Sequence, residues 1–169
     1  MKVALGHQAR VGKDEFIDYM KKLLGPDAKI YIIRLAEPVY DISKNIQQIL
    51  GKPIEKNPVL LQFIGEGLRN IYTKDVWIDL ACSKIEEIMR NEPTSHIFIP
   101  DMRYPNEMTE LKRLGFTTVK IIRENRPIDR DPNHISETAL SSAKFDHIIN
   151  NNQNLEQYHS QIDSLSRML

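Results

Sequence analysis

The chain has 169 residues, a length that fits one domain of ordinary size. Its composition, 41% hydrophobic and 27% charged, is typical of a globular protein that buries a core without disulfides or metals. The 23 basic residues are matched by 23 acidic ones, which argues against a nucleic-acid-binding module, and the single cysteine excludes an internal disulfide and a multi-cysteine zinc site.

Short β-type runs alternate with amphipathic helical segments along the chain. Strands are expected at residues 3–5, 30–33, 97–99, 117–122 and 148–149. Helices are expected at about residues 16–24, 38–49, 58–71, 75–89, 105–114 and 155–165. The polar segment 124–137 is interpreted as a loop. Strands separated by helices indicate a three-layer α/β fold, with a mostly parallel sheet and helices on both faces. Such sheets bind ligands beyond the carboxyl ends of their strands.

The turn between the first strand and the first helix is the first candidate site. Its sequence is Gly6-His7-Gln8-Ala9-Arg10-Val11-Gly12-Lys13-Asp14. A phosphate-binding loop belongs at this place, because Gly12 lets the backbone approach an anion and Lys13 can reach the β- and γ-phosphates. Five residues separate Gly6 from Gly12 where the usual pattern has four, so His7 takes the usual first-glycine position. The alternative is an ordinary turn followed by a surface lysine.

Two acids accompany this loop. Asp14 replaces the Ser or Thr that normally ligates Mg²⁺, and we expect it to hold the ion through water, because a bare carboxylate would repel phosphate. Capping the first helical turn is an alternative role that is compatible with the first. Asp101 ends an apolar strand and would orient Mg²⁺ or its waters. Many strands end in Asp, so its role depends on the pairing with the loop.

The segment Asp101-Met102-Arg103-Tyr104-Pro105-Asn106-Glu107 resembles the D-x-R-(aromatic)-P-N-E signature of the viral, bacteriophage-type deoxynucleoside monophosphate kinases. These belong to the P-loop nucleoside monophosphate kinases. The Gly12-Lys13-Asp14 triplet, the Leu61–Gly65 run followed by Arg69 and Trp77, and the His134–Leu140 run are also similar to that family. Val11 stands where the family has serine, and this departure, with the extra loop residue, bears on the geometry of the loop.

The resemblance implies a set of cofactors and roles. ATP would lie on Gly6, Gln8, Ala9, Arg10, Val11, Gly12, Lys13 and Asp14, with Mg²⁺ at Asp14 and Asp101. The charge on the migrating phosphoryl group would be met by Lys13, Arg103, Arg126 and Arg130. The acceptor would be bound by Arg34, Gln62, Arg69, Trp77, Arg103, Asn106, Glu107, His134, Ser136 and Glu137. A lid at about residues 125–139 would exclude water.

Several of these roles have a structural alternative. Gln62 either reads a base edge or faces solvent on its helix. Trp77 at helical spacing is more often a core residue than a stacking platform. Ser136 can cap a short helix, and the lid segment can be a plain connecting loop. His134 has no second ligand at helical spacing, which argues against zinc.

The expected function is a single kinase domain, residues 1–169, that transfers the γ-phosphoryl group of ATP to a (deoxy)nucleoside monophosphate. Alternatives are a kinase of the same fold for another phosphorylated metabolite, of the phosphomevalonate type, and a non-catalytic nucleotide-binding regulator. We expect no nucleic-acid partner and no membrane association, because no apolar run approaches roughly 18 residues. A homodimer is left open. The expected location is the cytoplasm, that of the host if the protein is viral.

Overall fold

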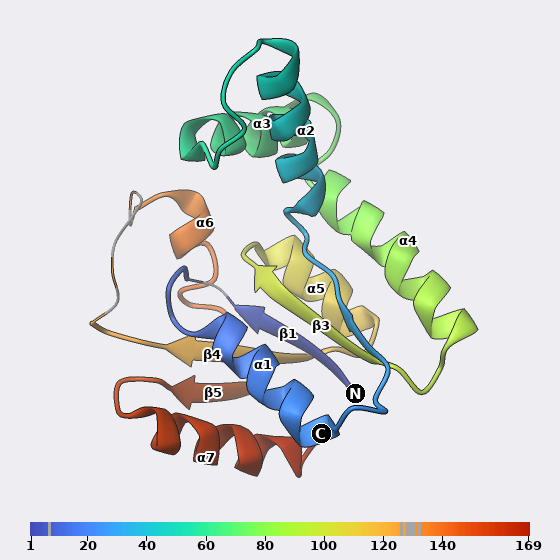
Figure 1. The fold of residues 1–169 in the computed structure, drawn as a ribbon, viewed down its shortest axis with the longest axis vertical. Coiled ribbons are helices and arrows are strands. Elements are labelled where there is room, and N and C mark those ends of the chain that lie inside the picture. Colours follow the sequence, from blue (N-terminus) through green and yellow to red (C-terminus); the bar gives the residue numbers. More distant parts are fainter. Residues whose placement is uncertain (7, 126, 128–130, 132) are drawn as a thin grey trace.

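The computed structural model describes residues 1–6, 8–125, 127, 131 and 133–169, which form an α/β fold (Figure 1). Its sheet consists of β1 (Lys2–Gly6), β2 (Ile30–Ile32), β3 (His96–Met102), β4 (Thr117–Ile122) and β5 (His147–Asn150). The strand order is β2-β3-β1-β4-β5, and each pair of neighbours runs parallel. The expected parallel sheet with helices on both faces is confirmed.

The helices begin and end close to the positions that the sequence predicts. They are α1 (Lys13–Leu24), α2 (Glu37–Ile49), α3 (Pro58–Ile71), α4 (Val76–Asn91), α5 (Pro105–Arg113), α6 (Ile135–Thr138) and α7 (Leu155–Ser166). Asn57 caps α3, because its side chain accepts a hydrogen bond from the Leu60 N–H at 3.0 Å.

The prediction of a loop over 124–137 is wrong at its end. The short helix α6 starts at Ile135, inside that segment, and four residues are too few to show an apolar period. The alternative interpretation, a short helix capped by Ser136, is right about the helix and wrong about the cap. The N-cap is His134, whose Nδ1 accepts the Ser136 N–H at 3.2 Å.

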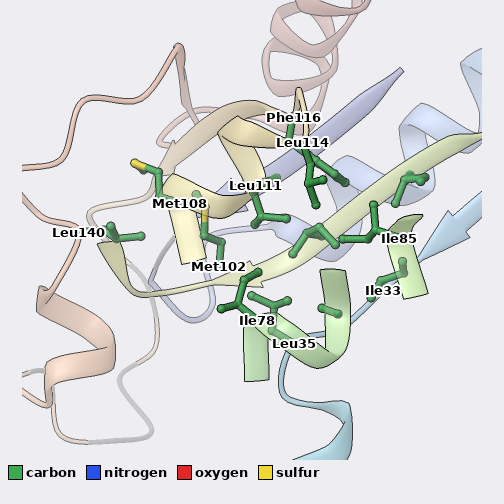
Figure 2. Packing of buried hydrophobic residues seen from close by; sticks show 14 of the residues in the cluster. Ile33, Leu35, Ile78, Ile85, Met102, Met108, Leu111, Leu114, Phe116 and Leu140 are labelled. Atoms are coloured by element: carbon green, nitrogen blue, oxygen red, sulfur yellow. The ribbon is translucent and has the colours of Figure 1, made fainter. Parts of the chain in front are cut away.

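Two buried clusters cover the two faces of the sheet, because side chains alternate along each strand. On β1, Val3 and Leu5 pack with the apolar side chains of α1 and α7, while Ala4 packs with those of α4 and α5. Figure 2 shows the second of these clusters, where Ile78 of α4 and Leu111 of α5 approach Met102 of β3. The three layers are therefore fixed by apolar burial on both sides of the central strands.

A third, smaller cluster lies away from the sheet. It joins α2, α3 and the start of α4 around Val39, Ile64 and Trp77 (Figure 1). These helices project beyond the carboxyl ends of β2 and β3, so they can form one wall of a site there.

The centre of that edge is the end of β1. Gly6 lies opposite Met102 of β3 on one side and Lys120 of β4 on the other. The chain leaves β1 towards β2 and returns on the far side as β4, so the loop after β1 lies where the strand order reverses, which is where ligands of such sheets bind. None of the helices in the described part of the chain combines the length and apolar composition needed to cross a bilayer.

Close packing at Gly6 yields a stability prediction. A Cβ atom built at this position would lie 2.5 Å from Cε1 of Phe145, a buried ring. We therefore expect Gly6→Ala to lower the free energy of unfolding by about 1–3 kcal/mol through overpacking, as measured by urea denaturation. A Phe145→Leu change made with it should recover part of the loss. If Gly6→Ala unfolds at the wild-type urea concentration, the ring moves aside at no cost and this packing constraint is absent.

Candidate functional site

The β1–α1 loop, residues 6–14, turns the chain from the sheet into the first helix. Gly12 is the N-cap of α1 and has a positive φ of 102°, a conformation that side chains with a Cβ rarely adopt. Arg10 also has a positive φ, 61°, and is exposed at the loop. Val11 is buried in the core, so only its backbone is available to a ligand. The helix α1 begins at Lys13, shortly after β1 ends at Gly6, and the N–H groups at the start of a helix suit an anion.

Asn151 and Tyr158, which the sequence does not point to, hold the backbone of this loop by hydrogen bonds. The amide of Asn151 donates to the Val11 carbonyl at 2.8 Å, and the hydroxyl of Tyr158 donates to the Gly12 carbonyl at 2.9 Å. Burial raises the pKa of Tyr158, so it remains a neutral donor. Both residues lie more than 130 positions away along the chain, after β5 and on α7. From the sequence, Tyr158 is expected only as one residue of the apolar face of α7, so its hydrogen bond to the loop is not predicted.

Lys13 is the first residue of α1, and its ammonium group donates to the Gln8 carbonyl in the same loop. Burial, followed by repulsion from Arg103, lowers the pKa of Lys13 to about 7. The carboxylates that oppose this shift are those of Glu137, Asp101 and Asp14. The fold thus brings the signature arginine and both candidate metal acids within electrostatic reach of Lys13, which the sequence could only suggest.

The two candidate metal acids differ in their surroundings. The oxygens of Asp101 accept the N–H groups of Leu35 and Ala36 at 2.9 and 3.0 Å, and burial raises its pKa. Asp14 is exposed and lies 3.1 Å from Nη2 of Arg34, itself half exposed. An exposed pair of this kind contributes little, at most about 1 kcal/mol, so both side chains can exchange partners when a ligand arrives.

These acids fit a magnesium site that the nucleotide completes. No group of three or more metal-ligating side chains occurs among the described residues. Mg²⁺ is commonly held by one or two carboxylates together with phosphate oxygens and water, and a carboxylate has about four lone-pair positions. Asp14 and Asp101 therefore retain acceptor capacity for such an ion or its waters.

Arg103 leaves the end of β3 and enters a buried charge cluster. Its Nη1 pairs with the carboxylate of Glu137 and donates to the Ser136 carbonyl at 3.2 Å. The other carboxylate oxygen of Glu137 accepts the Ala9 N–H at 3.0 Å. Glu137 is fully buried, so it links the β1–α1 loop, the end of β3 and α6.

Arg69 of α3 is held on the opposite side of the signature. Its Nη2 lies 3.0 Å from Oε1 of Glu107, and its guanidinium carbon lies 4.0 Å from the centroid of the Tyr104 ring. The Tyr104 hydroxyl in turn donates to Glu66 at 3.2 Å, and burial raises its pKa to about 12. Arg69 is thus fixed in one orientation before any ligand is present. Sequence reasoning named Arg69 but missed Tyr104 and Glu66, although the aromatic position of the signature pointed to the former.

Glu107 connects the two arginines. Its second oxygen accepts the backbone N–H groups of Arg103 at 2.7 Å and Tyr104 at 3.1 Å, while its first binds Arg69. Only 2% of the residue is exposed, and burial raises its pKa to about 7. Its carboxylate is therefore occupied by the protein, and the expected contact with the substrate is replaced by one with Arg69.

Two further residues that we expected to bind the acceptor also contact the protein. The amide of Asn106 donates to Asp75 Oδ1 at 2.8 Å and to the Lys74 carbonyl, which ties α5 to the turn before α4. Trp77 is 3% exposed and donates to the Gly65 carbonyl at 3.0 Å, so it is a core residue here and not a stacking surface. Gln62 is half-buried on α3.

The segment expected to form a lid lies partly outside the described residues. Arg126 and Arg130, two of the four expected charge partners, are outside the described residues, as is His7 of the loop. Of the expected lid, 125–139, the structure describes residues 125, 127, 131 and 133–139. In that part the ring nitrogen Nδ1 of His134 lies 2.9 Å from the Ser136 hydroxyl, so both side chains serve the cap of α6.

Comparison with known proteins decides the family. A family model described as deoxynucleotide monophosphate kinase matches residues 59–162, from α3 into α7.

The chain belongs to the deoxynucleotide monophosphate kinase family.

Two viral proteins are similar to this chain over most of its length. One is a protein of Acanthamoeba polyphaga mimivirus named "Putative deoxynucleotide monophosphate kinase", 31% identical over 114 residues, which are 62% of this chain and 58% of the relative. The other is the uncharacterized protein ORF77 of Ictalurid herpesvirus 1, 33% identical over 138 residues, which are 79% of this chain and 56% of the relative. The chain thus spans little more than half the length of these relatives.

The part of the chain that matches the kinase family contains Arg69, the signature around Asp101, and α6, but not the β1–α1 loop. The interpretation of that loop therefore rests on its own geometry and on its place at the switch point of the sheet.

The Arg69–Glu107 pair gives a prediction for this kinase fold. At pH 8, above the Glu107 pKa of about 7, Arg69→Ala leaves a buried carboxylate without its counter-ion. We expect the free energy of unfolding to fall by about 3 kcal/mol, as is typical when one partner of a buried pair is removed. At pH 6, where Glu107 can take up a proton, the loss should be smaller. Arg113→Ala, which breaks an exposed pair with Glu110 on α5, is the matched control, with an expected loss under about 1 kcal/mol. Equal losses at both pH values would contradict the assignment of the charge to Glu107.

Lys13 gives a second prediction, on the pH dependence of stability without ligand. Its pKa is about 7 in the folded chain and near 10.5 in the unfolded one. Between these values the unfolded chain binds the additional proton, so the free energy of unfolding gains a contribution that rises with pH. Urea denaturation at pH 7 and pH 9 should show that Lys13→Met loses this rise. Lys22→Met, at an exposed position of the same helix, should keep it. Parallel pH dependences of Lys13→Met and wild type would show that Lys13 is not buried beside Arg103.

Proposed function

We propose that this chain is an ATP-dependent (deoxy)nucleoside monophosphate kinase, which converts the monophosphate and ATP into the diphosphate and ADP. The observation that carries the proposal is that Glu137 joins Arg103 of the signature to the β1–α1 loop, because its carboxylate pairs with Arg103 and accepts the Ala9 N–H. Arg103 is also close enough to the loop to help lower the pKa of Lys13. Two cations so close together, at the start of a helix, suit a multiply charged phosphate chain. We take residues 1–169 as one kinase domain that acts in the cytoplasm, that of the host if the protein is viral.

The reaction proposed is an in-line transfer without a covalent enzyme intermediate. An oxygen of the acceptor phosphate forms a bond to the γ-phosphorus, the bond from that phosphorus to the β,γ-bridging oxygen breaks, and ADP leaves with the bond electrons. The acceptor oxygen is already ionised, so no general base is needed. Lys13 and Arg103 would neutralise charge that spreads over the transferred group, together with Arg126 and Arg130 of the lid.

Magnesium has a supporting role in this scheme. Bound with ATP, Mg²⁺ would neutralise the β- and γ-phosphates. Asp14 and Asp101 would hold the ion through water, and Asp14 would leave Arg34 to do so. Lys13 would then exchange the Gln8 carbonyl for phosphate oxygens, which favour its charged form.

The acceptor would bind between α3 and the end of β3. Arg69 is already oriented there by Glu107 and Tyr104, so little ordering entropy remains to be lost when a phosphate binds. Gln62 lies seven residues before Arg69 on the same helix, about 10 Å along its axis, a span that suits the distance from phosphate to base. We therefore keep Gln62 as the candidate base reader and Arg34 as a further phosphate contact.

The test is a coupled ADP-release assay with all ribo- and deoxynucleoside monophosphates, with small phosphorylated metabolites such as phosphomevalonate, and without acceptor. Acceptor-dependent ADP release with at least one deoxynucleoside monophosphate is expected, and EDTA should abolish it. Turnover with a phosphorylated metabolite alone would establish the first alternative. Binding of ATP without turnover on any acceptor would establish a regulator.

Arg69→Ala separates the two nucleotide sites. Loss of one charge-assisted contact, about 1.5–3 kcal/mol, should raise the acceptor KM by about tenfold to hundredfold, with a much smaller change in the ATP KM. Steady-state kinetics at pH 6, where the stability loss is smallest, measure both. Arg90→Ala, at an exposed position near the end of α4, is the control and should change neither constant. A change in the ATP KM alone would show that the donor and acceptor sites are assigned the wrong way round.

A further inference from the structure

Glu137 is a fully buried carboxylate beside residues that suit phosphate. One of its oxygens pairs with Nη1 of Arg103, and the other accepts the Ala9 N–H at 3.0 Å. These partners lie 34 and 128 residues away along the chain. The carboxylate thus bridges the β1–α1 loop, which suits the donor, and the arginine that follows β3.

Direct binding of a nucleotide is a poor role for this group. A carboxylate and a phosphate repel each other, and the repulsion is stronger away from water. Both carboxylate oxygens already contact the protein, and Ala9 is itself 5% exposed, so its N–H is directed into the fold. The neighbouring Leu140 is fully buried in the core under α5, which anchors α6 in place (Figure 2).

We propose that Glu137 is a positioning residue, whose carboxylate fixes the backbone of the β1–α1 loop at Ala9 and orients the guanidinium of Arg103. The inference rests on the proposed function. A single buried anion would then set the donor loop and the arginine of the reaction centre in one geometry, which is what an in-line transfer requires. Its charge also offsets the repulsion between Arg103 and Lys13.

Glu137→Gln tests the role of the charge. The glutamine oxygen can still accept the Ala9 N–H, but Arg103 loses its counter-ion. We expect kcat to fall by about 10²-fold, the typical cost of misplacing a group by about 1 Å, while the Kd for ATP changes far less. Glu137→Asp keeps the charge on a shorter side chain and should lie between wild type and Glu137→Gln. Glu87→Gln removes an exposed carboxylate on α4 and should leave kcat unchanged.

A double-mutant cycle shows whether the effect passes through Arg103. Once Arg103→Met has removed the partner, Glu137→Gln should lower kcat by no more than about twofold, because residues that act as a unit are not additive. A merely structural carboxylate would lower kcat by the same factor in both backgrounds. That additive result, or an unchanged kcat in a folded Glu137→Gln protein, would overturn the proposal.

Hydrogen exchange of the Ala9 amide tests the contact in the wild-type protein and does not depend on any variant folding. Slow exchange with and without an ATP analogue is expected. Fast exchange without ligand would remove the contact, and faster exchange on nucleotide binding would mean that the carboxylate is a stand-in that phosphate displaces. Wild-type protein without turnover on any acceptor would refute the proposed function, while slow exchange at Ala9 would still establish the bridge.

Discussion

The site depends on two buried carboxylates behind the end of β3. Glu107 and Glu137 are each almost or fully removed from water, where an unpaired charge would be very costly. Each is offset by an arginine and by backbone N–H groups, so neither can move without losing its partners. Because those partners come from the β1–α1 loop, α3 and β3, this requirement aligns three separate parts of the chain. As a consequence, the guanidinium groups of Arg69 and Arg103 are held in fixed positions near the end of β3.

This arrangement changes the meaning of the signature that identifies the family. Of its seven residues, Asp101 holds the backbone after β2, Asn106 holds the turn before α4, and Glu107 holds Arg69. Tyr104 supports Arg69 through its ring. Most of the signature thus joins parts of the fold, and Arg103 is the member that we propose to act on the transferred phosphoryl group. A motif can be specific to an activity because it builds the scaffold of the site.

The sequence predicts the layers, the parallel sheet and the sites at strand ends, because these follow from apolar periodicity and from the place of glycine and charge in turns. It does not predict what buried polar groups contact. Asn151 and Tyr158 appear as a strand end and an apolar stripe, and only the packing of α7 against α1 brings them to the loop. In the same way, the sequence alone suggests that Glu137 binds the substrate, whereas the structure shows that its carboxylate is buried. The helix α6 is predicted only as an alternative to a loop, and with Ser136 as its cap, because it is a single turn and its actual cap is a histidine.

The charge balance of the site also suits an anionic ligand. Burial disfavours the charge on Lys13, and repulsion from Arg103 adds to this cost, so the pKa of Lys13 falls to about 7. The buried acids offset the repulsion in part. A phosphate chain placed between Lys13 and Arg103 would be attracted by both cations. The two positive charges that repel each other without a ligand would therefore both favour its binding. By linkage, the proton that Lys13 gives up near neutral pH should be taken up again when nucleotide binds. Asn151, which follows β5, and Tyr158 of α7 hold the backbone of the β1–α1 loop, so the loop keeps Lys13 beside Arg103 until a ligand binds.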